Sequence, residues 1–375
     1  MKIILVSQSL PPAAGGIQNY SHHLALQFSK WRDVTVIYAG AWRKRAGDRQ
    51  QPYKKVFYPI GNTYLFCAMT PWAIARVAGK NNARIVYHTH YATGFGSLIA
   101  KRLGLIDRYY VAAHAREIVK NNFGPIHHKW RDLLLRNAAG IFAVSRYTGN
   151  LIRGRGIPEE KVHIVPNGVD LNIFYPREKM EAKKRLGLTG KRIILTVSRL
   201  VKRKGIDTTI KALSYLDDTC SDLVYLIVGN GPYRKQLIRL AQRHSGSQRI
   251  IFTGPVPDED LPFFYSAADI FVMPSREEKG GCVEGFGLVF LEANACRTPV
   301  IGTRSGGIPD AVEEGVSGLL VRPDDPEDLA GAIKKLLTDD TLRSTLAQKG
   351  RERSLEYSWD NCAKYILKQI EHRKK

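Results

Sequence analysis

The chain has 375 residues, of which 44% are hydrophobic and 25% charged, and its formal net charge is +22. This length favours two domains with large cores, and the lack of any run of 18 apolar residues excludes a transmembrane helix. The five cysteines are odd in number and form no C-x-x-C pair, which favours a reduced compartment without structural disulfide or zinc.

The positive charge is concentrated in residues 1–170. This half holds 24 Lys and Arg against 8 Asp and Glu, a net of +16, whereas the remainder holds 33 against 27, a net of +6. Such an uneven distribution favours an anionic partner: a membrane surface, a nucleic acid or a phosphorylated substrate. Charge that serves only solubility is the alternative.

Short apolar runs alternate with helical patterns along the first half. The apolar start, residues 2–7, indicates a strand and not a signal peptide, and a helix is expected at about 18–28. A basic loop is expected at 43–55. The other expected strands are 34–38, 85–88, 109–113, 141–144 and 162–165. Alternation of this kind predicts a parallel sheet with right-handed crossovers, and the turn residues at 166–170 end the half.

The same pattern restarts in the second half. Expected strands lie at 192–197, 223–228, 250–252, 270–273, 300–301 and 318–321. We therefore predict an α/β fold of two tandem doubly wound sheets, with domains at 1–170 and 171–357. The C-terminal helix, at about 358–375, is expected to pack on the first domain. Ligands of such sheets bind at the carboxyl ends of the strands, so a cleft between the domains is expected there.

The stretch 276–302 carries a local signal for binding. A glycine-bearing loop contains Glu284, and a buried helix is expected from about Leu288. A strand, a glycine loop and a helix start direct backbone N–H groups and a positive dipole end at one point, which suits a phosphate. Glu284 and Glu292 are eight residues apart, a spacing suited to hydroxyl groups on two parts of one ligand.

Six short motifs occur along the chain: Gly15-Gly16, H-A-R-E from His114, P-N-G-V-D at 166–170, S-R-L-V-K-R-K-G at 198–205, V-G-N-G-P at 228–232 and Glu284-x7-Glu292. Together and in this order they resemble glycosyltransferase family 4, a large family of retaining enzymes with the two-Rossmann GT-B fold. The longer loop G-G-C-V-E-G-F-G is similar to bacterial members that mannosylate lipids, such as phosphatidylinositol mannoside enzymes. Two positions differ: Cys282 stands where Asp is frequent, and Arg297 where Gly is common.

The resemblance implies a role for each matching residue in binding a nucleotide-sugar. Arg199 and Lys204 would stabilise the charge of the departing diphosphate, whereas Lys202 and Arg203 fit solvated loop charge. Glu292 would hold the ribose. Glu284 would face the sugar. His114 would also face the sugar, as a hydrogen-bond partner and not as a titrating base. The catalytic residues are then His114, Arg199, Lys204 and Glu284. The other donor-binding positions are Gly15, Gly16, Val256, Phe286, Gly287, Leu288 and Glu292.

Two further patterns favour less specific interpretations. His88 and His90 alternate at the end of a strand, but two ligands are too few for zinc; a place on the acceptor side of the cleft is one interpretation, core packing the other. Asp258-Glu259-Asp260 resembles a metal-binding D-x-D motif, yet it follows Pro257 and precedes an apolar helical pattern, so it indicates a helix start. We expect no metal and no cofactor.

The resemblance also implies a reaction and a location. It implies front-face transfer of a hexose, of mannose or glucose type, with retention, to a lipid-linked or envelope-glycan acceptor on the cytoplasmic face of the plasma membrane. Alternatives are a small soluble acceptor, a related epimerase or glycogen-type synthase, or nucleic-acid binding, for which no module is recognised. The candidate membrane-facing residues are Arg43, Lys44, Arg45, Lys54, Lys55, Lys129, Trp130, Arg131, Leu133–Leu135 and Arg136.

Overall fold

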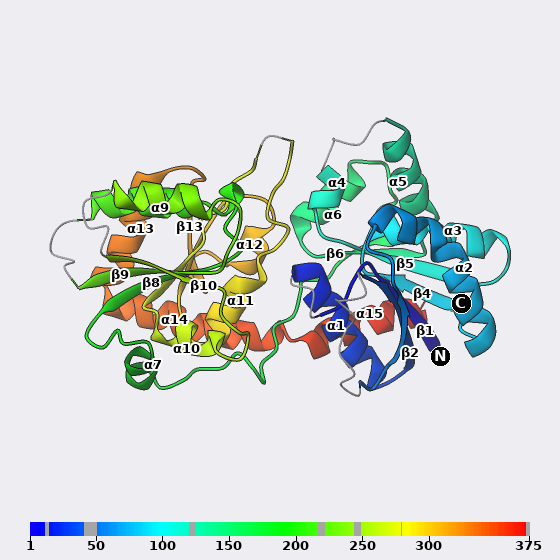
Figure 1. Cartoon of the computed structure of the whole chain (residues 1–375), viewed down its shortest axis with the longest axis horizontal. Coiled ribbons are helices and arrows are strands. Elements are labelled where there is room, and N and C mark those ends of the chain that lie inside the picture. Colours follow the sequence, from blue (N-terminus) through cyan, green and yellow to red (C-terminus); the bar gives the residue numbers. More distant parts are fainter. Residues whose placement is uncertain are drawn as a thin grey trace. The chain divides into compact units, whose positions relative to one another are not determined.

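The computed structural model describes residues 1–11, 15–40, 51–119, 125–216, 222–243, 249–278 and 280–372 (Figure 1). The chain separates into two compact units. Unit 1 comprises Met1–Asn167 together with Trp359–Lys375, and unit 2 comprises Gly168–Ser358. Each unit is described below by itself.

Unit 1 is built on a seven-stranded sheet in the order β3-β2-β1-β4-β5-β6-β7, with every neighbouring pair parallel. The central strands are buried on both faces, which explains their continuous apolar sequences. The predicted parallel sheet is confirmed. The strands are β1 (Lys2–Ser7), β2 (Asp33–Ala39), β3 (Lys54–Tyr58), β4 (Ile85–His88), β5 (Arg108–Ala113), β6 (Gly140–Ala143) and β7 (Val162–Ile164).

Helices cover both faces of this sheet. The α-helices of unit 1 are α1 (Gly16–Ser29), α2 (Thr63–Asn81), α3 (Phe95–Arg102), α4 (Arg116–Val119), α5 (Pro125–Asn137), α6 (Arg146–Arg153) and α15 (Trp359–His372), and its 3₁₀ helices are η2 (Tyr91–Gly94) and η3 (Glu159–Lys161). Helix α15, red in Figure 1, packs against α1, so the end of the chain completes the core of unit 1.

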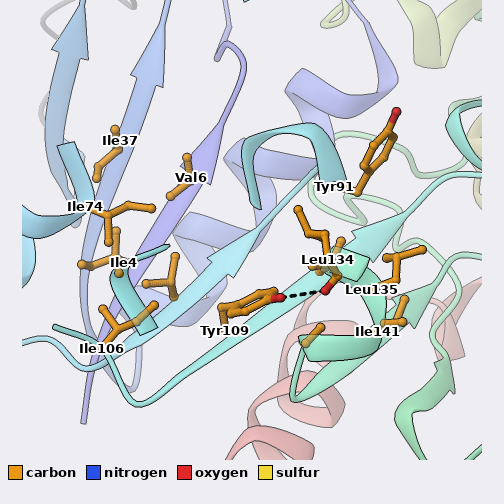
Figure 2. Close-up of a cluster of buried hydrophobic side chains, with 14 of the residues drawn as sticks. Ile4, Val6, Ile37, Ile74, Tyr91, Ile106, Tyr109, Leu134, Leu135 and Ile141 are labelled. Atoms are coloured by element: carbon orange, nitrogen blue, oxygen red, sulfur yellow. Dashed lines mark hydrogen bonds between the residues drawn. The ribbon is translucent and has the colours of Figure 1, made fainter. Parts of the chain in front are cut away.

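Alternate residues of the strands enter two separate cores, because side chains of a strand point to opposite faces. On one face, a single buried cluster contains Ile4 and Val6 of β1, Ile74 of α2 and Leu134 of α5 (Figure 2). There the Tyr109 hydroxyl is satisfied by donating to the Leu134 carbonyl at 2.7 Å. On the other face, aromatic side chains of the strands pack against α1 and α15.

Strand β3 corrects one prediction. Residues 43–55 were expected to form a basic loop; residues 43–50 lie outside the described residues, but Lys54 and Lys55 begin β3. Among the described residues, β3 pairs with β2 alone and forms the edge of the sheet. Lysines are common on edge strands, where they oppose pairing with other chains, and the density of charge therefore concealed the strand.

Unit 2 contains a six-stranded sheet in the order β10-β9-β8-β11-β12-β13, again with all pairs parallel. Its strands are β8 (Arg192–Val197), β9 (Leu223–Val228), β10 (Ile250–Gly254), β11 (Ile270–Val272), β12 (Val300–Thr303) and β13 (Gly318–Val321). Its helices are α7 (Lys179–Arg185), η4 (Lys202–Lys204), α8 (Ile206–Ala212), η5 (Leu213–Tyr215), α9 (Arg234–Gln242), α10 (Leu261–Ala267), α11 (Leu288–Ala295), α12 (Ile308–Ala311), α13 (Pro326–Thr338) and α14 (Asp340–Glu356). The second predicted sheet is confirmed as well.

Candidate functional site

The basic turn at 202–204 lies against the carboxyl end of β11. The turn forms the short 3₁₀ helix η4 and ends at Gly205, whose φ is +69°. A Cβ atom at Gly205 would lie 1.9 Å from the Pro274 carbonyl oxygen, so only glycine allows this approach. The contact brings Lys204, which is buried, toward the loop that follows β11.

A carboxylate and two cations meet between these two segments. One oxygen of Glu284, Oε2, accepts from Lys204 Nζ at 2.5 Å and from Arg203 Nη1 at 2.9 Å. All three side chains are largely buried. The sequence interpretation of Arg203 as a solvated loop charge was therefore wrong, whereas its neighbour Lys202 is exposed. Sequence spacing gave no means of distinguishing the two.

The ion pairs of this group keep the Glu284 carboxylate ionised near neutral pH. Burial alone would raise the pKa of Glu284, but the ion pairs with Lys204 and Arg203 lower that pKa to about 2. Burial lowers the pKa of the Lys204 ammonium, and Glu284 opposes this effect. Glu284 is consequently an anion that lies between two basic side chains, Lys204 and Arg203.

The start of α11 lies just after Glu284 and offers backbone donors. Its N-cap is Gly287, with φ +94°, and among the described residues no side chain caps the helix and no acidic residue lies in its first turn. Phe286 is buried and stacks on Tyr357, with ring centroids 6.4 Å apart. The Phe290 N–H donates to the Gly287 carbonyl oxygen at 3.0 Å. Of the first turn, the N–H groups of Leu288 and Val289 are thus available for an anion.

Glu292 has a different environment from Glu284. Its Oε2 accepts from the buried Tyr265 hydroxyl at 2.7 Å. Burial raises the pKa of Glu292 to about 7, the negative charge of Asp258 adds to this effect, and the Tyr265 hydrogen bond opposes it. Val256 lies half-buried between β10 and α10. Tyr265 had no sequence signal beyond its apolar helix, and sequence reasoning did not identify it.

Arg199 stays apart from the Glu284 group. It follows β8 and its side chain is exposed. Within the described residues, Glu284 pairs with Arg203 and Lys204, and not with Arg199. The two cations expected to act together are therefore in different settings: Lys204 is paired in the interior, and Arg199 projects to the surface.

Unit 1 places His114 where β5 ends. The His114 Nε2 atom lies 2.9 Å from the Thr89 carbonyl oxygen, so Nε2 carries the hydrogen and donates. The ring also packs edge-on against Tyr20 at 4.9 Å. The next residue, Ala115, has φ +75° and is buried; such strain in a non-glycine residue concentrates at functional sites.

The other expected residues of unit 1 lie at the same edge of the sheet. Gly15 is the N-cap of α1, the helix that follows β1 in the chain and begins at Gly16, and Gly15 has φ +152°. His88 is fully buried and uses both ring nitrogens, toward Thr93 Oγ1 at 2.9 Å and Ser97 Oγ at 2.8 Å. Burial lowers the pKa of His88 to about 3. These contacts favour core packing, the alternative left open for His88.

His90 is held by a local contact. Its Nδ1 accepts from the Ala92 backbone N–H at 3.1 Å and so caps η2. Burial lowers the pKa of His90, and His90 is therefore a neutral side chain near pH 7. No cluster of three metal-binding side chains occurs within the part of the chain that the structure describes. As predicted, the Asp258-Glu259-Asp260 segment leads into a helix, α10, which starts at Leu261.

The membrane-facing candidates divide into two groups. Lys129, Trp130 and Arg136 are exposed. Arg131, in contrast, is buried and donates to Asp132 and to the Ile118 carbonyl oxygen. Leu134 and Leu135 belong to the core of unit 1 (Figure 2). Their assignment to a membrane-facing surface was wrong, because a run of apolar residues beside cations can equally be the buried face of a helix.

Comparison with known proteins defines the class. The model of Glycosyltransferase Family 4 matches residues 14–173, and the model of Glycosyl transferases group 1 matches residues 178–353. The chain belongs to glycosyltransferase family 4, as the sequence motifs implied, and it has the GT-B fold of two Rossmann-like units.

Relatives with assigned activities cover nearly the whole chain. The GDP-mannose-dependent alpha-(1-6)-phosphatidylinositol monomannoside mannosyltransferase of Mycolicibacterium smegmatis is 31% identical over 95% of each chain. The GDP-mannose-dependent monoacylated alpha-(1-6)-phosphatidylinositol monomannoside mannosyltransferase of Corynebacterium glutamicum is 31% identical over 96% of this chain and 95% of its own. The D-inositol 3-phosphate glycosyltransferase of Corynebacterium jeikeium is 28% identical over 99% of this chain and 96% of its own.

Solved structures show the same fold. Sucrose-phosphate synthase from Thermosynechococcus elongatus superposes with a TM-score of 0.83 and 26% identity, covering 99% of this chain and 98% of that one. HepE from Anabaena, in complex with UDP, gives a TM-score of 0.85 at 20% identity over 99% of this chain and all of its own. At that identity HepE supports the fold alone.

Proposed function

We propose that this chain is a retaining, metal-independent hexosyltransferase that transfers mannose from GDP-mannose to a phosphatidylinositol-based glycolipid. The observation that carries the proposal is the group of Glu284, Lys204 and Arg203 beside the uncapped start of α11. Fixed cations and free backbone donors suit a diphosphate leaving group. The names of the relatives that span the chain support mannose and a lipid acceptor.

The proposed reaction needs positioning and charge stabilisation more than proton transfer by a side chain. The acceptor oxygen would bond to the anomeric carbon on the face from which the phosphate leaves, and the hydroxyl proton would pass to the departing phosphate. Lys204 and Arg199 would stabilise the growing negative charge. Glu292 would hold the ribose, while Glu284 and His114 would face the sugar.

A ligand panel tests the donor assignment first. Thermal unfolding of the full chain is followed with GDP-mannose, UDP-glucose, UDP-N-acetylglucosamine and ADP-glucose, each with and without a chelator. We expect the largest rise in melting temperature with GDP-mannose, unchanged by the chelator. Equal stabilisation by all four nucleotide-sugars would contradict a donor site that is specific for one nucleotide base. Proton NMR of the product then reports the anomeric configuration, and an inverted linkage would exclude retention.

One observation favours a second acceptor class. The inositol phosphate glycosyltransferase relative spans 99% of this chain, and its name specifies a small phosphorylated polyol. Product analysis with D-inositol 3-phosphate and, separately, phosphatidylinositol mannoside in vesicles distinguishes the two acceptors. If only D-inositol 3-phosphate is glycosylated, it replaces the lipid as the acceptor in our proposal. The assignment of the donor site would not change.

We further propose that unit 1 attaches the enzyme to the anionic cytoplasmic face of the membrane. Within the described residues no helix is both long and apolar enough to cross a bilayer, so attachment would be peripheral. Between Asp48 and Asp107 the sequence has no acidic residue but eight Lys or Arg. Each cation near an anionic leaflet contributes about 1 kcal/mol. Arg43, Lys44 and Arg45, also predicted to contribute, lie outside the described residues.

Helix α2 adds an exposed apolar face to these cations. Leu65, Ala68, Trp72 and Arg76 follow helical spacing and are all exposed, Trp72 by 55%. Tyr64, beside them at the start of the helix, is 69% exposed. Large aromatic side chains next to cations are typical of helices that lie in the membrane interface.

Vesicle co-sedimentation tests this face. The wild-type chain should bind vesicles with anionic lipid more strongly than neutral ones, and the preference should weaken with salt. Replacing Leu65 and Trp72 together by Ser should reduce binding severalfold. Leu355→Ser, on the exposed side of α14 in unit 2, is the matched control. Equal binding of wild type to neutral and anionic vesicles at low salt would argue against the attachment.

A further inference from the structure

The Glu284 group poses a conflict for donor binding. The proposed function needs Lys204 at the diphosphate, yet in this structure its Nζ is 2.5 Å from Glu284 Oε2. Lys204 is the more deeply buried of the two cations on that oxygen. An ammonium that turns toward a phosphate gives up part of its interaction with the carboxylate. Glu284 would then remain as a buried charge, which is costly unless another partner holds it.

Arg203 is placed to be that partner. Its Nη1 already donates to the same oxygen of Glu284 at 2.9 Å. A guanidinium has five donors in a rigid fork and can engage both oxygens of a carboxylate. Arg203 therefore can hold Glu284 by itself without moving far.

The backbone of Arg203 is anchored independently of the site. Its carbonyl oxygen accepts from the Arg276 backbone N–H at 2.8 Å. The Arg276 side chain is itself buried and donates to both carboxylate oxygens of Asp207 at 2.8 Å. The turn that carries Arg203 is thus fastened to the segment leading to Glu284, so the backbone of Arg203 need not move when Lys204 changes partner.

We infer that Arg203 is a positioning residue that keeps Glu284 paired when Lys204 turns from this carboxylate to the donor diphosphate. The inference rests on the proposed function, because it takes Lys204 as the ligand of the diphosphate. Glu284, held by Arg203, keeps its orientation toward the sugar. Binding of the diphosphate and placement of the sugar are then coupled through one carboxylate.

GDP alone, without sugar, is the probe for the experiment. Its affinity for the full chain is measured by titration calorimetry at pH 7.5. Lys204→Gln should weaken GDP binding at least tenfold. Arg203→Gln should weaken GDP binding about tenfold, because Lys204 could then turn to the diphosphate only by leaving Glu284 buried and unpaired. Arg203→Lys should recover part of this loss. Lys202→Gln, which removes an exposed cation of the same turn, is the matched control and should change affinity by less than twofold.

The double variant separates this mechanism from a simple loss of charge. If Arg203 only adds positive potential, then Glu284→Gln raises GDP affinity by the same factor with or without Arg203. If Arg203 takes over Glu284, then Glu284→Gln restores affinity at least tenfold more in the Arg203→Gln background. With the sugar donor, Arg203→Gln should also lower kcat, since Glu284 loses its orientation.

The outcomes distinguish the inference from the function on which it rests. Unchanged GDP affinity in Lys204→Gln would overturn the proposed diphosphate site, and the inference with it. A tenfold loss in Lys204→Gln, with additive effects of Arg203→Gln and Glu284→Gln, would overturn the inference alone. Circular dichroism and thermal unfolding of each variant show whether a loss of affinity reflects a loss of fold.

Discussion

Glu292 should make the stability of the enzyme depend on pH in a predictable way. Burial raises its pKa from the ordinary 4.5 to about 7, so the folded chain binds a proton that the unfolded chain has lost. Stability is therefore fully present below about pH 4.5 and falls as pH rises through 7. A tenfold change in an ionisation constant corresponds to about 1.4 kcal/mol, which sets a ceiling of about 3 kcal/mol for the loss.

Glu292→Gln removes this ionisation and keeps an oxygen that can accept from Tyr265. We expect the variant to gain about 1–3 kcal/mol relative to wild type between pH 5 and pH 8. Urea unfolding of the full chain, without nucleotide, measures the difference at both pH values. Because every other titrating group is shared, the change in the difference isolates Glu292.

The control and the refuting result are equally specific. Glu259→Gln, on the exposed turn before α10, should show no such change with pH. If the stability difference between Glu292→Gln and wild type is the same at pH 5 and pH 8, then Glu292 is not desolvated as described. Donor affinity offers a second readout, since a neutral Glu292 is a weaker acceptor for ribose hydroxyls and KM for the donor should rise below pH 7.

Four other changes have defined outcomes. Lys204→Ala should lower turnover by two or more orders of magnitude with an unchanged circular dichroism spectrum, and near-wild-type rates would remove it from the site. Gly205→Ala should cost at least about 2 kcal/mol in urea unfolding, because its Cβ would lie 1.9 Å from the Pro274 carbonyl oxygen. Arg297→Gly should stabilise by about 0.5–1 kcal/mol, because Arg297 has φ +61° after α11. Burial lowers the pKa of His88 to about 3, so the folded chain resists protonation and its free energy of unfolding falls as pH drops below 6.5. Between pH 6.5 and 4.5, the His88→Asn variant should lose about 2 kcal/mol less of this free energy than wild type.

The fold could be predicted because its signals are local and repeated. Strands of a parallel sheet are buried on both faces, and runs such as 223–228 therefore stand out from the charged helices between them. The helix from Leu288 was predicted from the glycine loop before it, and it begins at that residue. The edge strand β3 carried no such signal, since a strand with one neighbour needs little apolar sequence.

The pairing of side chains could not be predicted in the same way. Lys202, Arg203 and Lys204 are consecutive cations, and their sequence gives no reason to separate them. Their environments differ because η4 turns Arg203 and Lys204 toward a carboxylate that lies 81 and 80 residues later in the chain. Likewise, both ring nitrogens of His88 find hydroxyl groups on the helical segment that follows. Such contacts depend on the path of the backbone, which residue types alone do not specify.

The two glutamates of the motif illustrate what the tertiary structure adds to a spacing. Glu284 and Glu292 are both partly buried, yet cations lower the pKa of Glu284 to about 2 while burial raises that of Glu292 to about 7. Environments that separate two pKa values in this way assign different tasks to the same residue type. A carboxylate with a pKa near 2 is a poor general base at neutral pH. With Lys204 and Arg203 both paired to it, as in this structure, Glu284 is therefore unsuited to take a proton. This is consistent with the departing phosphate as the destination of the acceptor proton in the proposed reaction.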